Sequence, residues 1–128
     1  MNALGNHLLV ELYECDAALL DDLDGITDAM VEAALEAGAT VIDRTFHRFA
    51  PQGVSGVVVI AESHLAIHTW PEHRYAAVDV FTCGTRVSPD RCADILCERL
   101  GSKRQRRIHV PRGPAEDVRG PVGEPRPA

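Results

Sequence analysis

Residues 55–82 read SGVVVIAESHLAIHTWPEHRYAAVDVFT and hold three strand patterns in a row. Residues 55–60 form an apolar, β-branched run that is typical of a buried strand. Extended structure is expected again over residues 64–70, and Pro71 ends it with a turn over residues 71–74. Residues 75–82 alternate between apolar and polar side chains, which predicts a third strand with one covered face.

The flanking segments add further elements on each side. An acidic, turn-like stretch with a short helical turn is expected over residues 16–24. The patterns predict strands over residues 7–13, 40–49 and 106–110, a helix that begins at a Thr27 or Asp28 cap and ends near Glu36, and a helix that Ser88 caps with Pro89 in its first position. This order predicts an α+β fold, a two-layer α/β sandwich in which a mainly antiparallel sheet carries its helices on one face. Because apolar side chains on the other face of the sheet would need a partner to cover them, the pattern favours a dimer.

The composition divides the chain into two parts. Residues 1–110 are expected to form a single domain. Residues 111–128 are rich in proline and glycine and almost free of apolar side chains, so we expect a disordered tail.

Charge and composition exclude several classes of protein. The net charge is −6 and the isoelectric point is about 5.4, which argues against nucleic-acid binding. The basic run at residues 103–107 is interpreted as a solvated strand edge or a charged surface. The sequence has no apolar stretch that would span a membrane and no secretory signal, so a cytoplasmic location is expected. No metal-finger spacing links the cysteines, and free thiols are predicted at Cys15, Cys83, Cys92 and Cys97.

Reactive side chains gather between residues 46 and 84. Glu62 and Ser63 follow a buried strand, His68 lies further along, and Cys83 comes just after the third strand. A hydrolase nucleophile at Ser63 is a weak interpretation, because no G-x-S-x-G elbow surrounds it. A serine on a strained backbone can instead attack the carbonyl group of the preceding residue. Zinc bound by His64, His68 and Cys83 is a further alternative that no carboxylate pattern supports, and no metal is predicted.

The string Ala61–Glu72, AESHLAIHTWPE, resembles the processing motif of bacterial and archaeal S-adenosylmethionine decarboxylases. The similarity extends over about residues 5 to 110. The flanks that agree are Gly5-x-His7, Tyr13-Glu14-Cys15, Thr45-Phe46-His47-Arg48-Phe49, Gly53-Val54-Ser55-Gly56-Val57-Val58-Val59 and Phe81-Thr82-Cys83-Gly84.

The resemblance implies that the chain is a proenzyme. The Ser63 hydroxyl would attack the Glu62 carbonyl group and form an ester, and elimination would then leave a pyruvoyl group at residue 63. The products would be a β chain, 1–62, and an α chain, 63–128. The family implies that His68 transfers a proton during processing, and Ser55 is likewise associated with that step.

The resemblance also implies a carboxy-lyase that acts on S-adenosylmethionine for spermidine biosynthesis. The covalent pyruvoyl cofactor would form a Schiff base with the substrate, and Cys83 would return a proton to the α-carbon. Phe49 and Trp70 would stack on the adenine, and Glu72 would bind the ribose hydroxyls. Family members are expected to be homodimers of α/β pairs.

Two other hypotheses stay open at this point. The same pyruvoyl chemistry serves a decarboxylase of ornithine or arginine, for which the adenine-binding residues would be dispensable. An unprocessed, non-enzymatic relative is the third hypothesis, and the joint presence of Glu62, Ser63, His68 and Cys83 argues against it.

Overall fold

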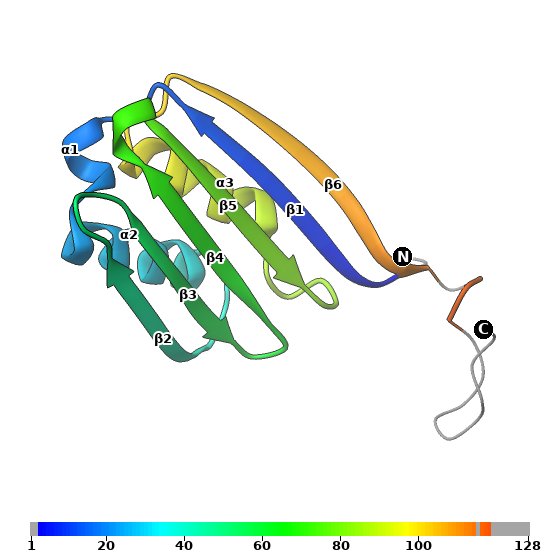
Figure 1. Cartoon of the computed structure of the whole chain (residues 1–128). Helices are drawn as coiled ribbons and strands as arrows, with labels where there is room; N and C mark the ends of the chain where they lie inside the picture. Colours follow the sequence, from blue (N-terminus) through cyan, green and yellow to red (C-terminus); the bar gives the residue numbers. More distant parts are fainter. Residues whose placement is uncertain (1–2, 115, 119–128) are drawn as a thin grey trace.

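A six-stranded sheet forms one layer of the molecule in the computed structural model, which describes residues 3–114 and 116–118 (Figure 1). The strand pairings within these residues are all antiparallel. Across the sheet, the strands follow the order β2 (Val41–Arg48), β3 (Val54–Ile60), β4 (Ser63–Trp70), β5 (Tyr75–Thr82), β1 (Ala3–Tyr13) and β6 (Arg104–Pro114).

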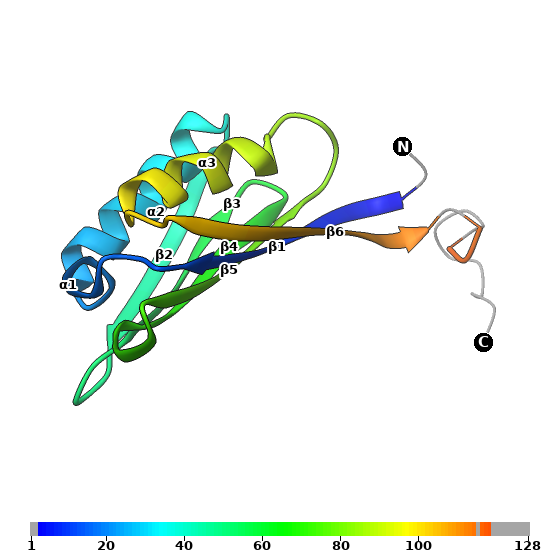
Figure 2. The same ribbon diagram turned by 90° about the horizontal axis from the view of Figure 1, so that it is seen from above.

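The helices form a second layer on one face of the sheet (Figure 2). Helix α2 (Leu23–Glu36) packs against β2 and β3, and α3 (Pro89–Arg99) packs against β5 and β1. A short helix α1 (Ala17–Leu20) and a 3₁₀ turn η1 (Pro71–His73) contact each other at one end of the sheet. The predicted α+β sandwich is confirmed.

Alternation along the strands places the hydrophobic core between the two layers. On β4, Leu65 and Ile67 are fully buried, and Ile26 and Met30 of α2 are buried with them. The opposite face of the sheet has no layer above it within the described residues. Apolar side chains remain exposed there by 37% to 41%, at positions Val57, Val59, Trp70 and Ile108.

Strands β1 and β6 are longer than the sequence indicated. β1 begins at Ala3 and pairs with β6 as far as Pro114. The predicted boundary of the tail at residue 111 was therefore too early, because the strand continues beyond it. Pro111 is tolerated because β6 is an edge strand, where a missing N–H breaks no central ladder. A turn follows at residues 116–118, and the tail residues 119–128 lie outside the described part of the chain.

Helix α2 begins at Leu23, earlier than the predicted cap at Thr27 or Asp28. Asp22 has the extended backbone of a cap residue, and Asp24 provides a negative charge in the first turn. The hydroxyl of Thr27 donates to the Leu23 carbonyl oxygen at 2.8 Å, as in a helix interior. The predicted cap of α3 is confirmed, since the Ser88 hydroxyl accepts from the helix backbone.

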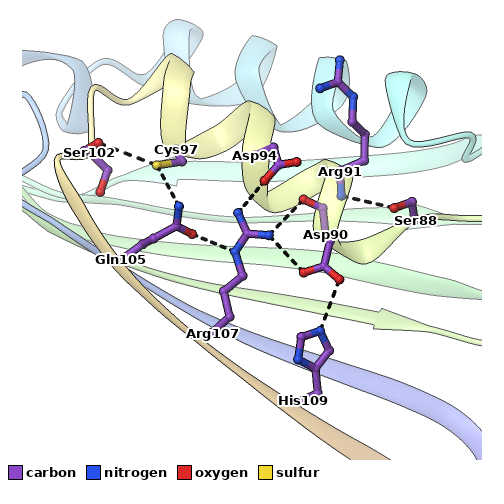
Figure 3. Close-up of polar contacts among 9 residues, drawn as sticks. All are labelled: Ser88, Asp90, Arg91, Asp94, Cys97, Ser102, Gln105, Arg107 and His109. Carbon is purple, nitrogen blue, oxygen red and sulfur yellow. Dashed lines mark hydrogen bonds and ion pairs between the residues drawn. The ribbon is translucent and has the colours of Figure 1, made fainter.

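Edge strand β6 is tied to α3 by a polar network on the helix side of the sheet (Figure 3). Arg107 donates to the Asp90 carboxylate at 3.0 Å and to Asp94 at 2.6 Å, and His109 lies 3.3 Å from Asp90. Burial raises the pKa of Asp90, but hydrogen bonds from Arg107 and His109 outweigh it and leave the pKa lowered. Within the basic run, Arg107 is therefore a paired structural residue.

Candidate active site

The turn that joins β3 to β4 holds the peptide bond between Glu62 and Ser63. The turn consists of Ala61 and Glu62, and the backbone φ of Glu62 is 73°. This left-handed conformation favours glycine, and a side chain there costs on the order of 1–3 kcal/mol. Ala61 is held in place because its N–H donates to the Thr40 carbonyl oxygen at 2.9 Å. The bond that follows Glu62 thus lies next to a strained residue.

Ser63 lies beside Cys83 at the same end of the sheet. The Ser63 Oγ is 3.6 Å from the Cys83 Sγ, and both residues are half-buried. Ser63 is the first residue of β4 and Cys83 comes just after β5, and the pairing of these two strands brings their ends together. Cys83 also lines a recess of about 230 Å³ that includes Phe81 and Arg112.

Ser55 and His68 form a second contact between neighbouring strands. They are paired residues on β3 and β4, and the Ser55 Oγ lies 2.8 Å from the His68 Nδ1. The same two side chains line a recess of about 270 Å³ together with Phe49, Trp70 and Glu72. The structure therefore collects the expected substrate-binding residues around the Ser55–His68 pair.

The predicted site residues form two groups rather than one within a single chain. Ser63 is the first residue of β4, and His68 lies five residues further along it. An antiparallel strand rises by about 3.4 Å per residue, so the two lie about 17 Å apart. We define a cleavage group, Glu62, Ser63 and Cys83, and a recess group, Phe49, Ser55, His68, Trp70 and Glu72.

Aromatic residues extend the recess group across the sheet, and two of them were not anticipated from the sequence. Trp70 stacks on Tyr75 with ring centroids 5.3 Å apart, and Tyr75 stacks on Tyr13 at 5.7 Å. The Tyr75 hydroxyl donates to Glu11 at 2.7 Å, and burial together with this carboxylate raises the pKa of Tyr75. Their signal in the sequence was the alternation of β5 and β1, which places alternate side chains on the uncovered face.

The structure also shows the state of the four cysteines and whether the candidate zinc ligands lie together. All four cysteines are free, as predicted, and burial raises the pKa of Cys15 to about 11 and that of Cys92 to about 12. Among the described residues, no three His, Cys, Asp or Glu side chains gather as metal ligands. His68 contacts Ser55 while Cys83 contacts Ser63, so the pattern considered for zinc is not assembled.

No helix in the described part of the chain is long and apolar enough to cross a membrane.

Comparison with known proteins adds evidence that is independent of this geometry. Residues 6–113 match the family described as S-adenosylmethionine decarboxylase. The S-adenosylmethionine decarboxylase proenzyme of Acetivibrio thermocellus is 59% identical over 117 residues, which are 91% of this chain and 94% of that protein. The proenzyme of Thermotoga maritima is 50% identical over 125 residues, which are 98% and 96% of the two chains.

A solved structure agrees with the sequence relatives. The crystal structure of the adenosylmethionine decarboxylase from Aquifex aeolicus VF5 matches with a TM-score of 0.84 and 37% identity. The match covers 94% of this chain and 100% of that chain. The expected family is confirmed: the chain belongs to the S-adenosylmethionine decarboxylase family.

Proposed function

We propose that this carboxy-lyase cuts its own chain between Glu62 and Ser63 and then decarboxylates S-adenosylmethionine with the pyruvoyl group so formed. The observation that carries the proposal is the cleavage group, in which a strained Glu62 precedes a serine that lies 3.6 Å from a thiol. The relatives are named proenzymes, which supports a precursor that is cut. The ornithine or arginine alternative finds no support in these comparisons.

The proposed self-cleavage uses only atoms of the chain and water. The Ser63 oxygen attacks the Glu62 carbonyl carbon, the C–N bond breaks, and the hydroxyl proton passes to the released nitrogen. An ester and a free Ser63 amine replace the amide. Removal of the Ser63 α-proton then forms a double bond between Cα and Cβ, and Glu62 leaves as a carboxylate. The resulting dehydroalanine takes up water and loses ammonia, which leaves a ketone at residue 63. Relief of the strain at Glu62 favours the first step.

The residues around position 63 fit a pyruvoyl group. Its parent side chain is half-buried at a strand end, with the Cys83 thiol in contact. When formed, the pyruvoyl group supplies an electron sink for decarboxylation of an α-amino acid. The Cys83 thiol lies beside position 63, which supports our assignment that it returns a proton to the α-carbon after carbon dioxide leaves.

The recess group provides the proposed contacts to the nucleoside. Phe49 and Trp70 present aromatic faces at the recess, and both are partly exposed, at 47% and 40%. Such faces suit the flat adenine ring and the positive sulfonium group. Glu72 lines the same recess and offers a carboxylate to the ribose hydroxyls. The Ser55–His68 pair would serve proton transfer during processing, because its 2.8 Å contact is a direct hydrogen bond.

The separation of the two groups supports a homodimer. The uncovered face carries the exposed side chains of Val57, Val59 and Ile108, which a second copy would bury. Suppose that the two sheets stack face to face and that the two-fold axis lies between them, perpendicular to the strands. The rotation then reverses the strand direction, so one end of a strand in one copy lies over the opposite end of the same strand in the other copy. The cleavage group of one copy then meets the recess group of the other, and each dimer holds two composite sites.

We also propose a use for the product and a cellular compartment for the enzyme. The decarboxylated product would serve as the aminopropyl donor for spermidine biosynthesis. A reducing cytoplasm suits the chain, because its four thiols are free.

Intact-mass measurement of the purified protein tests the proposal. We expect two chains, 1–62 and 63–128, with a ketone at the start of the second. Borohydride in the presence of S-adenosylmethionine should add the mass of the substrate remnant to the second chain, and carboxyl-labelled substrate should release carbon dioxide. A folded chain that stays uncut would refute the self-cleavage. A cut chain that releases carbon dioxide from ornithine or arginine instead would refute the substrate assignment.

A further inference from the structure

A second cavity borders the cleavage turn, and the mechanism above leaves it without a role. It has a volume of about 300 Å³, and both Glu62 and Cys83 line it. The basic side chain in its lining is Arg86, which belongs to the loop between β5 and α3. The cavity therefore combines the residue before the cut, the thiol beside the cut and one guanidinium group.

Arg86 is tied to the residue that holds the cleavage turn. Its Nη2 donates to the Thr40 hydroxyl at 3.2 Å, and the Thr40 carbonyl oxygen accepts from the Ala61 N–H at 2.9 Å. The loop around Arg86 is anchored as well: Val87 is buried, and the Ser88 N–H donates to the Ala37 carbonyl at 3.1 Å. Arg86 itself is exposed, so these contacts position its charge while leaving it free to engage an anion.

Self-cleavage creates an anion at this place. Before the cut, the Glu62 carbonyl belongs to a neutral amide. During elimination, the bond between the ester oxygen and the Ser63 Cβ breaks, and its electron pair stays on the oxygen. Glu62 then carries an α-carboxylate in addition to its side-chain carboxylate. A guanidinium binds a carboxylate through two parallel hydrogen bonds, and Arg86 lines the same cavity as Glu62.

We propose that Arg86 stabilises the Glu62 carboxylate as it leaves Ser63, and that it holds this new chain end once the cut is complete. The inference rests on the proposed self-cleavage and assigns a residue to its second step. The first step exchanges an amide for an ester and frees the Ser63 amine, so it leaves no lasting negative charge for Arg86 to meet. Loss of Arg86 should therefore slow elimination and let the ester accumulate.

Cell-free synthesis followed by a timed chase tests the assignment, because it shows the precursor before it is cut. The variants are R86Q, which removes the charge, R86K, which keeps it, and R91Q as the matched control on α3. Hydroxylamine cuts an ester at the Glu62–Ser63 junction, and the second chain then begins with an intact serine. We expect R86Q to slow pyruvoyl formation at least about tenfold and to accumulate a full-mass, hydroxylamine-sensitive chain. R86K should recover most of the rate, and R91Q should match the unaltered chain.

A second variant keeps the guanidinium but loosens it. T40V removes the hydroxyl that accepts from Arg86, and we expect a smaller accumulation of the same ester. Circular dichroism checks that each variant is folded, and T40V carries the test should R86Q not fold. Cleavage of R86Q at the unaltered rate would overturn the inference, as would a blocked chain that resists hydroxylamine. An unaltered chain that never cuts would instead refute the proposed function itself.

Discussion

A mixed dimer gives the sharpest test of the two-group arrangement. Ser63 and His68 lie five residues apart on β4, which corresponds to about 17 Å. No side chain spans that distance, so the proposed role of His68 in processing requires that His68 of one chain serve Ser63 of the other. Two chains carrying Ser63→Ala and His68→Ala each lack part of every site when alone. Together they form a mixed dimer in which the His68→Ala chain keeps its own serine and receives the histidine of its partner.

The expected yield follows from random pairing. Equal amounts of the two chains assemble in the ratio 1:2:1, and about half of the His68→Ala chains then lie in mixed dimers. We therefore expect about half of these chains to be cut, whereas the Ser63→Ala chains stay whole. Different affinity tags on the two chains allow each to be followed by intact mass after co-expression, and co-purification of the tags reports the mixed dimer.

His64→Ala serves as the matched control. His64 is next to Ser63 on β4, yet it belongs to neither group, so this variant should cut itself without a partner. Cleavage of His68→Ala alone at the unaltered rate would refute the role of His68. Mixed dimers that co-purify but leave the His68→Ala chain whole would refute the composite site, and tags that never co-purify would refute the dimer.

Three further predictions concern single side chains. Cys83→Ala should lower the rate of carbon dioxide release by about 10²–10⁴-fold, while Cys97→Ala should not, and a turnover assay on the cut protein that finds equal rates would contradict the proton-donor role. Leu65→Ala should cost about 2–5 kcal/mol of unfolding free energy in urea, because Leu65 is fully buried under the helices, and a change below about 1 kcal/mol would contradict its place in the core. Asp90→Asn should lower the melting temperature at neutral pH, because Asp90 is ionised and paired with Arg107. Its pKa is lowered in the folded chain, so this stabilisation is present above the unfolded pKa of about 3.9 and is lost as the pH falls through the folded value. The melting temperatures of Asp90→Asn and the unaltered protein should therefore converge in acid, and a constant difference would contradict the pairing.

Local patterns predicted the elements well where one face of a segment is buried. β3, β4 and β5 were recognised because their alternation matches the two-residue repeat of a strand. The end of β6 was missed because Pro111 and Gly113 resemble a loop in composition, whereas an edge strand paired to β1 accommodates both. The start of α2 was misplaced because threonine and aspartate are both common helix caps, so the pattern did not separate Thr27 from Asp22. In the structure, Asp22 is the cap residue.

The chemistry of the site was predictable only as a set of residue types. The motif around Ser63 identified the family and with it the roles expected of His68 and Cys83. The pattern placed His68 further along the same expected strand as Ser63, but nothing in it indicated that His68 contacts Ser55. Arg86 had no signal at all, since an isolated arginine in a loop resembles any surface charge.

The sequence alone determined the order of strands and helices, the face that each one buries and the reactive residues the chain carries, because these depend on neighbours within a few positions. Tertiary structure decided which of those residues meet. Strand pairing brings Cys83 to Ser63 and His68 to Ser55, and the loop after β5 brings Arg86 to Thr40. Such contacts join residues far apart along the chain, and only the register of the sheet and the packing of the loops select them.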